Sequence, residues 1–396
     1  MITRMAQPLV EAMAKQFPAV LILGPRQCGK TTLAKEFLEG VYFDLERPSD
    51  YEVFADDPEL ALGRLGNPLI LDEAQVLPAL FSVLRSVIDE DRKENGRFYL
   101  LGSVNPSLLR QVSEGLAGRV GMVELTPFLY PEVNAETLTL DEYWLRGGYP
   151  DACRESDADR RMRWLEQYVQ ALVQRDLAGY GLKTSPQEMR RFLGMLAHVH
   201  GGLLNASELG RSLGVTYHTV GSHLDILEGH FLIRRLQPWH SNLGKRLIKS
   251  PKLYMRDCGL LHYFLGIRTP RDLLQSPRRG ASWEGLLVEQ IIALEKLLHD
   301  GCQFWFYRTQ TGTEVDLIVE YGEERTGYEF KCGASVSRHD ASGLRTGLAD
   351  GVITQGMVVY AGSRRYPVTD DIEAIPAEML LTQYHTQLGR SRRLTR

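Results

Sequence analysis

The stretch of sequence with the clearest chemical meaning is a glycine-rich loop whose spacing suits a phosphate group. It consists of Gly24, Pro25, Arg26, Gln27, Cys28, Gly29, Lys30, Thr31 and Thr32. This order follows the pattern G-x-x-x-x-G-K-T, in which the glycines let backbone N–H groups close around phosphate oxygens. The lysine would pair with the β- and γ-phosphates, and the Thr31 hydroxyl would bind Mg²⁺. We therefore expect the cofactors to be ATP and Mg²⁺.

An acidic pair ends the apolar strand predicted over residues 68–73, and it is the natural partner of the loop. Asp72 would orient Mg²⁺, and Glu73 would polarise the attacking water as a general base. A strand that merely ends at the surface would show the same letters, but the phosphate loop upstream favours the functional interpretation.

A further polar position ends the strand predicted over residues 97–103. Ser103 or Asn105 would lie beside the γ-phosphate and could sense it. The alternative, given equal weight, is a turn in which Asn105 and Pro106 begin a helix.

A second group of charged residues lies near the C-terminus. Glu284 is near the start of a predicted helix, Asp316 lies in a strand over 313–320, and Glu329 and Lys331 lie in a strand over 327–331. Because strand side chains alternate between faces, pairing of these strands would bring the last three residues together. Such carboxylates could hold Mg²⁺ while Lys331 positions a nucleophile. The alternative is a row of alternating charges on an exposed sheet face.

The elements that must position the loop alternate between strand and helix. Apolar runs over 19–23, 41–45, 68–73, 97–103 and 122–125 read as strands, and residues 32–38 and 80–88 have helical spacing. This order predicts an α/β fold in which helices cover both faces of a parallel sheet.

The middle of the chain reads as helix, turn, helix and strand over residues 206–236, the pattern of a winged helix. The second helix could enter a DNA groove, with His218, Ser222 and His223 as its polar readers. It has no lysine or arginine, so a lid or spacer is an equally weighted alternative. Basic residues follow it, and they predict either nucleic-acid contact or a solvated face; they are Lys245, Arg246, Lys249, Lys252 and Arg256.

The length and composition of the chain limit the number of domains and the kinds of partner that we expect. A length of 396 residues suggests two to four domains, and a net charge of −4 argues against coating nucleic acid with the whole surface. The five cysteines form no C-x-x-C pair, so neither a disulfide framework nor a zinc site is indicated. No targeting segment or bilayer-spanning run is apparent, and we expect a cytoplasmic protein without membrane partners.

Several motifs together resemble one prokaryotic family, the AAA-type ATPases with a C-terminal domain of the PD-(D/E)XK nuclease-like superfamily. The similarity rests on the loop and on residues 71–75, 101–103, 116–120, 125–127, 147–150 and 245–252. It implies an arginine finger or sensor role for Arg119, in cis or from a neighbouring subunit, with a structural salt bridge as the alternative. The nuclease-like pattern matches Glu284, Asp316, Glu329 and Lys331, although Val315 stands where that pattern has proline.

These observations predict a P-loop NTPase parallel sheet, then a helical and winged-helix region, then a small mixed α/β restriction-endonuclease-like domain. The expected segments are an ATPase domain (1–135), a helical linker (136–200), a winged helix (201–270), a nuclease-like domain (275–385) and a basic tail (386–396). Two functions fit. One is an Mg²⁺-dependent ATPase that is coupled to the nuclease-like domain and acts on nucleic acid, with DNA as the expected partner and a homo-oligomer as a further expectation. The other is an ATP-dependent switch whose nuclease-like domain docks DNA or a protein partner without cleavage.

Overall fold

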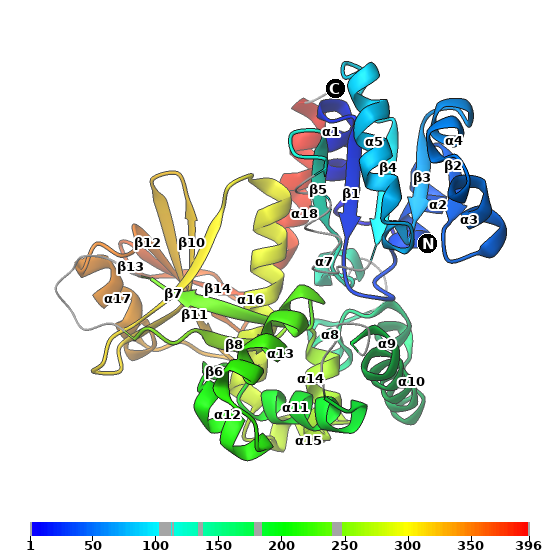
Figure 1. The fold of residues 1–396 in the computed structure, drawn as a ribbon. Helices are drawn as coiled ribbons and strands as arrows, with labels where there is room; N and C mark the ends of the chain where they lie inside the picture. The colour runs from blue at the N-terminus through cyan, green and yellow to red at the C-terminus, as the bar shows by residue number, and fades with distance from the viewer. Residues whose placement is uncertain are drawn as a thin grey trace. The chain divides into compact units, whose positions relative to one another are not determined.

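The computed structural model describes residues 2–102, 112, 115–133, 138–177, 184–239 and 248–394. It divides into two compact units (Figure 1). The first comprises Met1–Phe128 with Gly229–Phe231, and the second comprises Leu129–Glu228 with Leu232–Arg396.

The first unit is built on a five-stranded parallel sheet in the order β2-β3-β4-β1-β5. The strands are β1 (Ala19–Leu23), β2 (Val41–Asp44), β3 (Leu69–Asp72), β4 (Phe98–Gly102) and β5 (Val120–Glu124). The helices described in this unit are α1 (Gln7–Gln16), α2 (Lys30–Phe37), α3 (Pro48–Ala55), α4 (Pro58–Arg64) and α5 (Ala79–Glu90). The α/β class and the parallel sheet predicted from the sequence are confirmed.

Apolar patterning explains why these segments form a layered core. Every residue of β1 is buried, as expected for a parallel strand that is covered on both faces. Helix α5 buries Leu80, Phe81, Leu84 and Ile88, which recur at helical spacing. Helices α3 and α4 were not predicted. Each begins with a proline in its first turn, a position where proline is tolerated.

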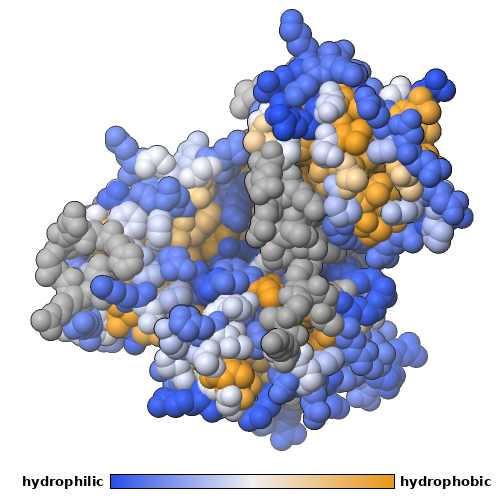
Figure 2. Space-filling model, viewed as in Figure 1, coloured by the Kyte–Doolittle hydropathy of each residue, from blue (hydrophilic) through white to orange (hydrophobic). Residues whose placement is uncertain are grey.

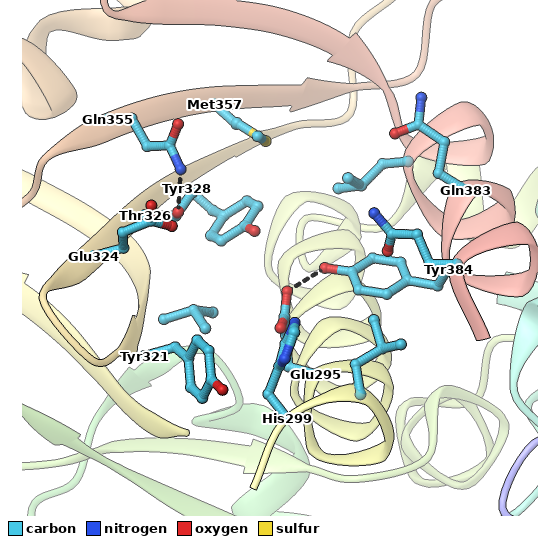
Figure 3. Close-up of a pocket in the computed structure, with 14 residues that line it drawn as sticks. Glu295, His299, Tyr321, Glu324, Thr326, Tyr328, Gln355, Met357, Gln383 and Tyr384 are labelled. Atoms are coloured by element: carbon cyan, nitrogen blue, oxygen red, sulfur yellow. Dashed lines mark hydrogen bonds between the residues drawn. The ribbon is translucent and has the colours of Figure 1, made fainter. Parts of the chain in front are cut away.

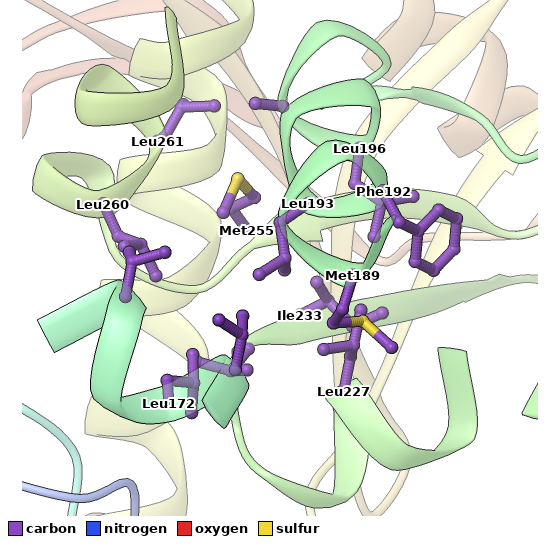
Figure 4. Packing of buried hydrophobic residues seen from close by; sticks show 14 of the residues in the cluster. Leu172, Met189, Phe192, Leu193, Leu196, Leu227, Ile233, Met255, Leu260 and Leu261 are labelled. Atoms are coloured by element: carbon purple, nitrogen blue, oxygen red, sulfur yellow. The ribbon is translucent and has the colours of Figure 1, made fainter. Parts of the chain in front are cut away.

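The helical part of the second unit has its own apolar core. Its helices include α7 (Tyr130–Val133), α8 (Leu140–Arg146), α9 (Pro150–Arg154), α10 (Ala158–Ala171), α11 (Pro186–His198), α12 (Ala206–Leu213), α13 (Tyr217–Gly229), α14 (Cys258–Leu265) and α15 (Pro270–Gln275). Leu193 and Leu196 of α11 pack with Leu227 of α13 and Leu260 of α14 in this core (Figure 4). The predicted pair of helices, α12 and α13, is therefore fixed by burial against its neighbours.

A nine-stranded mixed sheet runs through the second unit in the order β13-β14-β12-β11-β10-β9-β7-β8-β6. Its strands are β6 (Gly202–Leu203), β7 (Ile233–Pro238), β8 (Lys252–Met255), β9 (Gln303–Arg308), β10 (Glu314–Tyr321), β11 (Glu324–Lys331), β12 (Gln355–Tyr360), β13 (Tyr366–Thr369) and β14 (Ile372–Pro376). The helices in its C-terminal part are α16 (Arg279–Leu298), α17 (Ser342–Ala349) and α18 (Ala377–Leu394).

The strand predicted to follow the two helices of the winged helix belongs to this sheet as β7. Strands β7 and β8 form an antiparallel pair, and β7 also pairs in parallel with β9 through Gln237 with Trp305 and Pro238 with Phe306. The segments predicted as separate domains over 201–270 and 275–385 thus share one sheet. The predicted basic tail also differs, because helix α18 extends to Leu394.

Hydrophilic residues predominate on the face shown in Figure 2, and hydrophobic residues form separate groups there. No helix within the described part of the chain is both long enough and apolar enough to cross a bilayer.

Candidate functional site

The glycine-rich loop connects β1 to α2, and two of its glycines are required by its shape. Gly29 has a φ of 100°, a left-handed conformation that side chains other than glycine rarely adopt. A Cβ atom at Gly24 would lie 2.1 Å from the carbonyl oxygen of Leu125. The backbone therefore approaches β5 closely at one end of the loop and turns sharply into helix α2 at the other.

Lys30 is held inside the loop. Its Nζ donates to the carbonyl oxygens of Gly24 and Pro25, each at 3.0 Å, and the residue is only 6% exposed. A bound triphosphate would offer charged oxygens in place of these neutral carbonyls, and hydrogen bonds between charged partners are the stronger ones. The ammonium group is thus placed for the phosphate role predicted for it.

The predicted magnesium ligands lie against each other. Thr31 Oγ1 donates to Asp72 Oδ2 at 2.6 Å, and Tyr42 OH donates to the same oxygen at 2.7 Å. The backbone N–H of Glu73 donates to Asp72 Oδ1 at 3.0 Å. A hydroxyl and one carboxylate suit Mg²⁺, which takes its remaining ligands from nucleotide phosphates and water. Thr31 and Asp72 would hold this ion when nucleotide is bound.

Tyr42 was missed by sequence reasoning. It lies on β2, which pairs with β3, and its phenol reaches the carboxylate at the end of β3. Burial, reinforced by the hydrogen bond to Asp72, raises the pKa of the Tyr42 phenol well above its ordinary value. Tyr42 therefore stays protonated and fixes the orientation of Asp72. The apolar and aromatic residues around Tyr42 in the sequence gave no indication of this contact.

Glu73 has a strained backbone and a buried carboxyl. Its φ is 53°, in the left-handed region, and its side chain accepts a hydrogen bond from Gln75. Burial raises the pKa of Glu73, while the hydrogen bond from Gln75 and the charge of Lys30 oppose the rise. A raised pKa makes the carboxylate a better proton acceptor, which suits the predicted role as general base.

Arg4 is a second residue that sequence reasoning missed. Its Nη1 donates to the carbonyl oxygen of Cys28 at 2.9 Å, and its Nη2 donates to that of Thr126 at 2.6 Å. The guanidinium also lies 5.1 Å from the centre of the Phe128 ring. The buried arginine thereby ties the phosphate loop to the segment that follows β5, although no motif surrounds it in the sequence.

We expect Arg4→Met to weaken ATP binding roughly tenfold or more, because each lost hydrogen bond to a charged group is worth about 1.5–3 kcal/mol and the loop would no longer be held. Titration with a fluorescent ATP analogue would measure the change. The exposed Arg64 on α4 provides the control, and Arg64→Met should leave the affinity unchanged. Equal affinities for both variants would contradict a clamping role for Arg4.

Arg119 lies at the opposite end of the parallel strands from the loop. It precedes β5, and the N–H of Ala19 at the start of β1 donates to its carbonyl oxygen, whereas the loop follows the end of β1. Its guanidinium binds Asp89 through Nε at 2.7 Å and Nη2 at 2.8 Å. This hydrogen-bonded pair lowers the pKa of Asp89. The structure thus does not bring Arg119 to the phosphate loop of its own chain, and it forms the salt bridge that was the alternative. Ser103 and Asn105 lie outside the described residues.

The second predicted cluster comes together in the second unit. Asp316 and Glu329 lie on the paired strands β10 and β11, and Asp316 Oδ2 accepts the N–H of Phe330 at 3.0 Å. Lys331 Nζ donates to Glu329 Oε1 at 2.8 Å. The convergence expected from strand alternation is present, and Glu284 of α16 joins it through a further residue.

That further residue is Lys252 of β8. Its Nζ donates to Glu284 Oε1 at 2.8 Å, approaches Asp316 Oδ1 at 3.5 Å, and also contacts the carboxylate of Glu314. Tyr254 OH donates to Glu284 Oε1 at 2.6 Å. Both alternatives predicted for Lys252, nucleic-acid contact and a solvated face, are wrong, because its side chain lies among carboxylates and the residue is 2% exposed.

This arrangement does not fit the Mg²⁺ ion expected for a nuclease-like site. The ammonium group already contacts Glu284, Glu314 and Asp316, and in the native chain, within the described ranges, no group of three or more His, Cys, Asp or Glu residues could hold a metal ion. Burial raises the pKa of Glu284 to about 7, and burial with repulsion from Asp316 raises that of Glu329 to about 8. These carboxyl groups are already too crowded to hold full negative charge easily.

Other residues proposed for nucleic-acid contact divide into exposed and buried ones. His223 is buried and shares a hydrogen bond of 2.9 Å with Thr184, so it cannot read bases, whereas His218 and Ser222 are exposed. Arg256 pairs with Glu289 at 2.9 Å, and Lys249 is exposed. Lys245 and Arg246 lie outside the described residues.

A cavity of about 280 Å³ lies elsewhere in the second unit (Figure 3). Tyr328 lines it, whereas Glu329 belongs to the opposite face of β11 by strand alternation. Tyr384 donates to Glu295 Oε1 at 2.6 Å across this cavity (Figure 3). The cavity is therefore separate from the predicted nuclease-like cluster.

Comparisons with known proteins agree with the presence of a phosphate loop in the first unit. The model of the AAA domain matches residues 16–134, and two domains of unknown function, DUF8612 and DUF4143, match residues 137–271 and 279–380. The parallel sheet, the phosphate loop and the AAA match together identify an AAA domain in the first unit. The match over 279–380 gives no support to a nuclease-like assignment.

The chain is 40% identical over 370 residues to the uncharacterized proteins Rv2008c of Mycobacterium tuberculosis and Mb2031c of Mycobacterium bovis. This alignment covers 92% of the chain and 81% of each relative. The chain belongs to the same family as these two proteins.

Solved structures show only distant likeness. The ORC1 protein of Aeropyrum pernix, solved in complex with DNA, is 13% identical with a TM-score of 0.30, covering 64% of this chain and 89% of that one. A STAND protein of Pyrococcus horikoshii, PH0952, is 14% identical with a TM-score of 0.29, covering 76% of this chain and 46% of that one.

Proposed function

We propose that the first unit binds ATP with Mg²⁺ and hydrolyses it. The observation that supports this most is the hydrogen bond between Thr31 and Asp72, which joins the phosphate loop to the acidic end of β3. Lys30 would neutralise phosphate charge, and Glu73 would accept a proton from the attacking water. Bound Mg²⁺ would supply charge stabilisation at the β- and γ-phosphates.

We propose further that ATP acts as a switch for a second unit that docks a partner without cutting it. The position of Lys252 favours this function over metal-dependent cleavage, because the ammonium group lies where a catalytic metal would be needed. The nuclease-like fold would then serve as a binding surface, since a fold alone does not define an activity.

Nucleic acid, and DNA in particular, is the partner class we propose. Helices α12 and α13 and strands β7 and β8 follow one another in the order expected of a winged helix, and α13 exposes Tyr217, His218 and Ser222. Helix α13 has no lysine or arginine, so phosphate contacts must come from elsewhere, such as the exposed Lys249. A protein partner is the alternative that this helix without lysine or arginine leaves open.

A homo-oligomer would give Arg119 a second role. We propose this role only in trans, at the nucleotide of a neighbouring subunit, because Arg119 does not approach its own loop. An arginine finger contributes about 10³–10⁵ in rate, whereas loss of a surface salt bridge costs roughly 1 kcal/mol or less. The ATP turnover of Arg119→Ala would therefore separate the two roles.

One experiment tests the proposal as a whole. ATP turnover is measured with and without single-stranded, duplex and branched DNA, and the same reactions are run on a cleavage gel. We expect Mg²⁺-dependent turnover that changes with DNA, and intact DNA in every lane. Cleavage that is abolished in the Asp316→Ala and Lys331→Ala double variant would overturn the docking function and restore the nuclease. Absence of turnover under all conditions would overturn the ATPase.

A further inference from the structure

We propose that Lys252 is a built-in cation that replaces a divalent metal in the nuclease-like fold, so that its removal opens a divalent-cation site at Glu284, Glu314 and Asp316. This inference rests on the proposed non-cleaving role of the second unit and gives a physical reason for it. It concerns the cluster of the second unit alone.

Three carboxylates surround the ammonium group of Lys252. A lysine side chain has three donors, and the contacts of Lys252 Nζ are with three carboxylates, from α16 and β10. The contacts with Glu284 at 2.8 Å and Asp316 at 3.5 Å are made to α16 and β10, so the ammonium group bridges these two elements. A divalent ion at the same place would need these same oxygens.

The balance of charge depends on this one lysine. Arg308 pairs with Glu314 at 3.1 Å, and Lys331 pairs with Glu329 at 2.8 Å. Among the residues that the structure describes, Lys252 is the cation that pairs with Glu284 and Asp316. Without it, two buried carboxylates would face each other unpaired, which is strongly unfavourable unless another cation enters.

Because Lys252 is covalently part of the chain, its positive charge stays at this position. Lys252 opens β8, a strand paired with β7, and its Nζ is buried with the residue at 2% exposure. A covalently attached charge has a very high effective concentration at its own site. To bind there, a metal ion at millimolar concentration would have to displace the ammonium group, which would then have to move into solvent. Free Mg²⁺ or Mn²⁺ should therefore fail to bind here.

The test is a titration of the full chain with Mn²⁺ in the absence of nucleotide, read by electron paramagnetic resonance. We expect Lys252→Met, which keeps the length of the side chain and removes its charge, to bind one Mn²⁺ at least tenfold more tightly than the native chain does. Adding Asp316→Asn to this variant should remove the gain. Lys252→Arg keeps a positive charge and should resemble the native chain.

Two outcomes would overturn the inference. One is Mn²⁺ binding by the native chain that Asp316→Asn abolishes, a measurement that does not require Lys252→Met to fold. The other is a folded Lys252→Met variant, by circular dichroism, with no gain in binding. A native chain that binds Mn²⁺ at the cluster but leaves DNA intact would defeat this inference and spare the docking function. DNA cleavage without Mn²⁺ binding at the cluster would contradict the docking function and leave this inference standing.

Discussion

Replacement of Lys30 with alanine is expected to lower the affinity for ATP about a hundredfold and to reduce turnover to background. The side chain would supply charge-assisted hydrogen bonds to two phosphates, each worth about 1.5–3 kcal/mol, and alanine supplies none. Isothermal titration with a non-hydrolysable ATP analogue gives the affinity, and phosphate release gives the rate.

The same change removes the donor for the carbonyl oxygens of Gly24 and Pro25, so the variant must be shown to fold. Circular dichroism serves for this. Lys93→Ala is a matched control, because Lys93 is an exposed lysine of the first unit that follows α5. A folded Lys30→Ala variant with native affinity and native turnover would mean that nucleotide does not bind at the loop.

Replacement of Glu73 with glutamine should separate binding from hydrolysis. The amide keeps the shape of the side chain but cannot accept a proton, so the rate should fall by roughly 10²–10⁴ while the affinity for ATP stays close to native. Single-turnover hydrolysis and analogue binding measure the two quantities. The exposed Glu52→Gln on α3 is the control.

The pH profile of the native enzyme offers an independent check on Glu73. Burial raises its pKa above that of an ordinary glutamate, and the base is lost as the pH falls through that raised value. The acid limb of the turnover profile should therefore lie above the ordinary glutamate range. An unaltered rate in Glu73→Gln would assign the base to another residue.

The proposed ATP site could be predicted from the sequence to the extent that its parts are local motifs. The loop, Thr31, Asp72 and Glu73 follow fixed spacings, and the structure places Thr31 against Asp72. Tyr42 and Arg4 reach the same site from β2 and from the N-terminal segment. Their contacts depend on strand order and on burial of a guanidinium, and neither leaves a periodic signal in the sequence.

In the second unit, alternation along two strands was sufficient to predict that Asp316, Glu329 and Lys331 converge. It was insufficient to predict Lys252, because this lysine comes from a strand assigned to a different domain. The pairing of β7 with β9 that joins these regions links Gln237 to Trp305, far along the chain. His223 was misread for a similar reason, since its burial is set by α11 and the neighbouring segment rather than by its own helix.

The continuity of the nine-stranded sheet has a mechanical consequence. A force applied to α12 and α13 would pass from β8 and β7 into β9 and onward through inter-strand hydrogen bonds, without meeting a flexible joint between those strands. The nine strands should therefore resist deformation together, as one rigid sheet. Expressing residues 279–396 alone would remove β7 and leave the edge of β9 bare, a surface that invites aggregation.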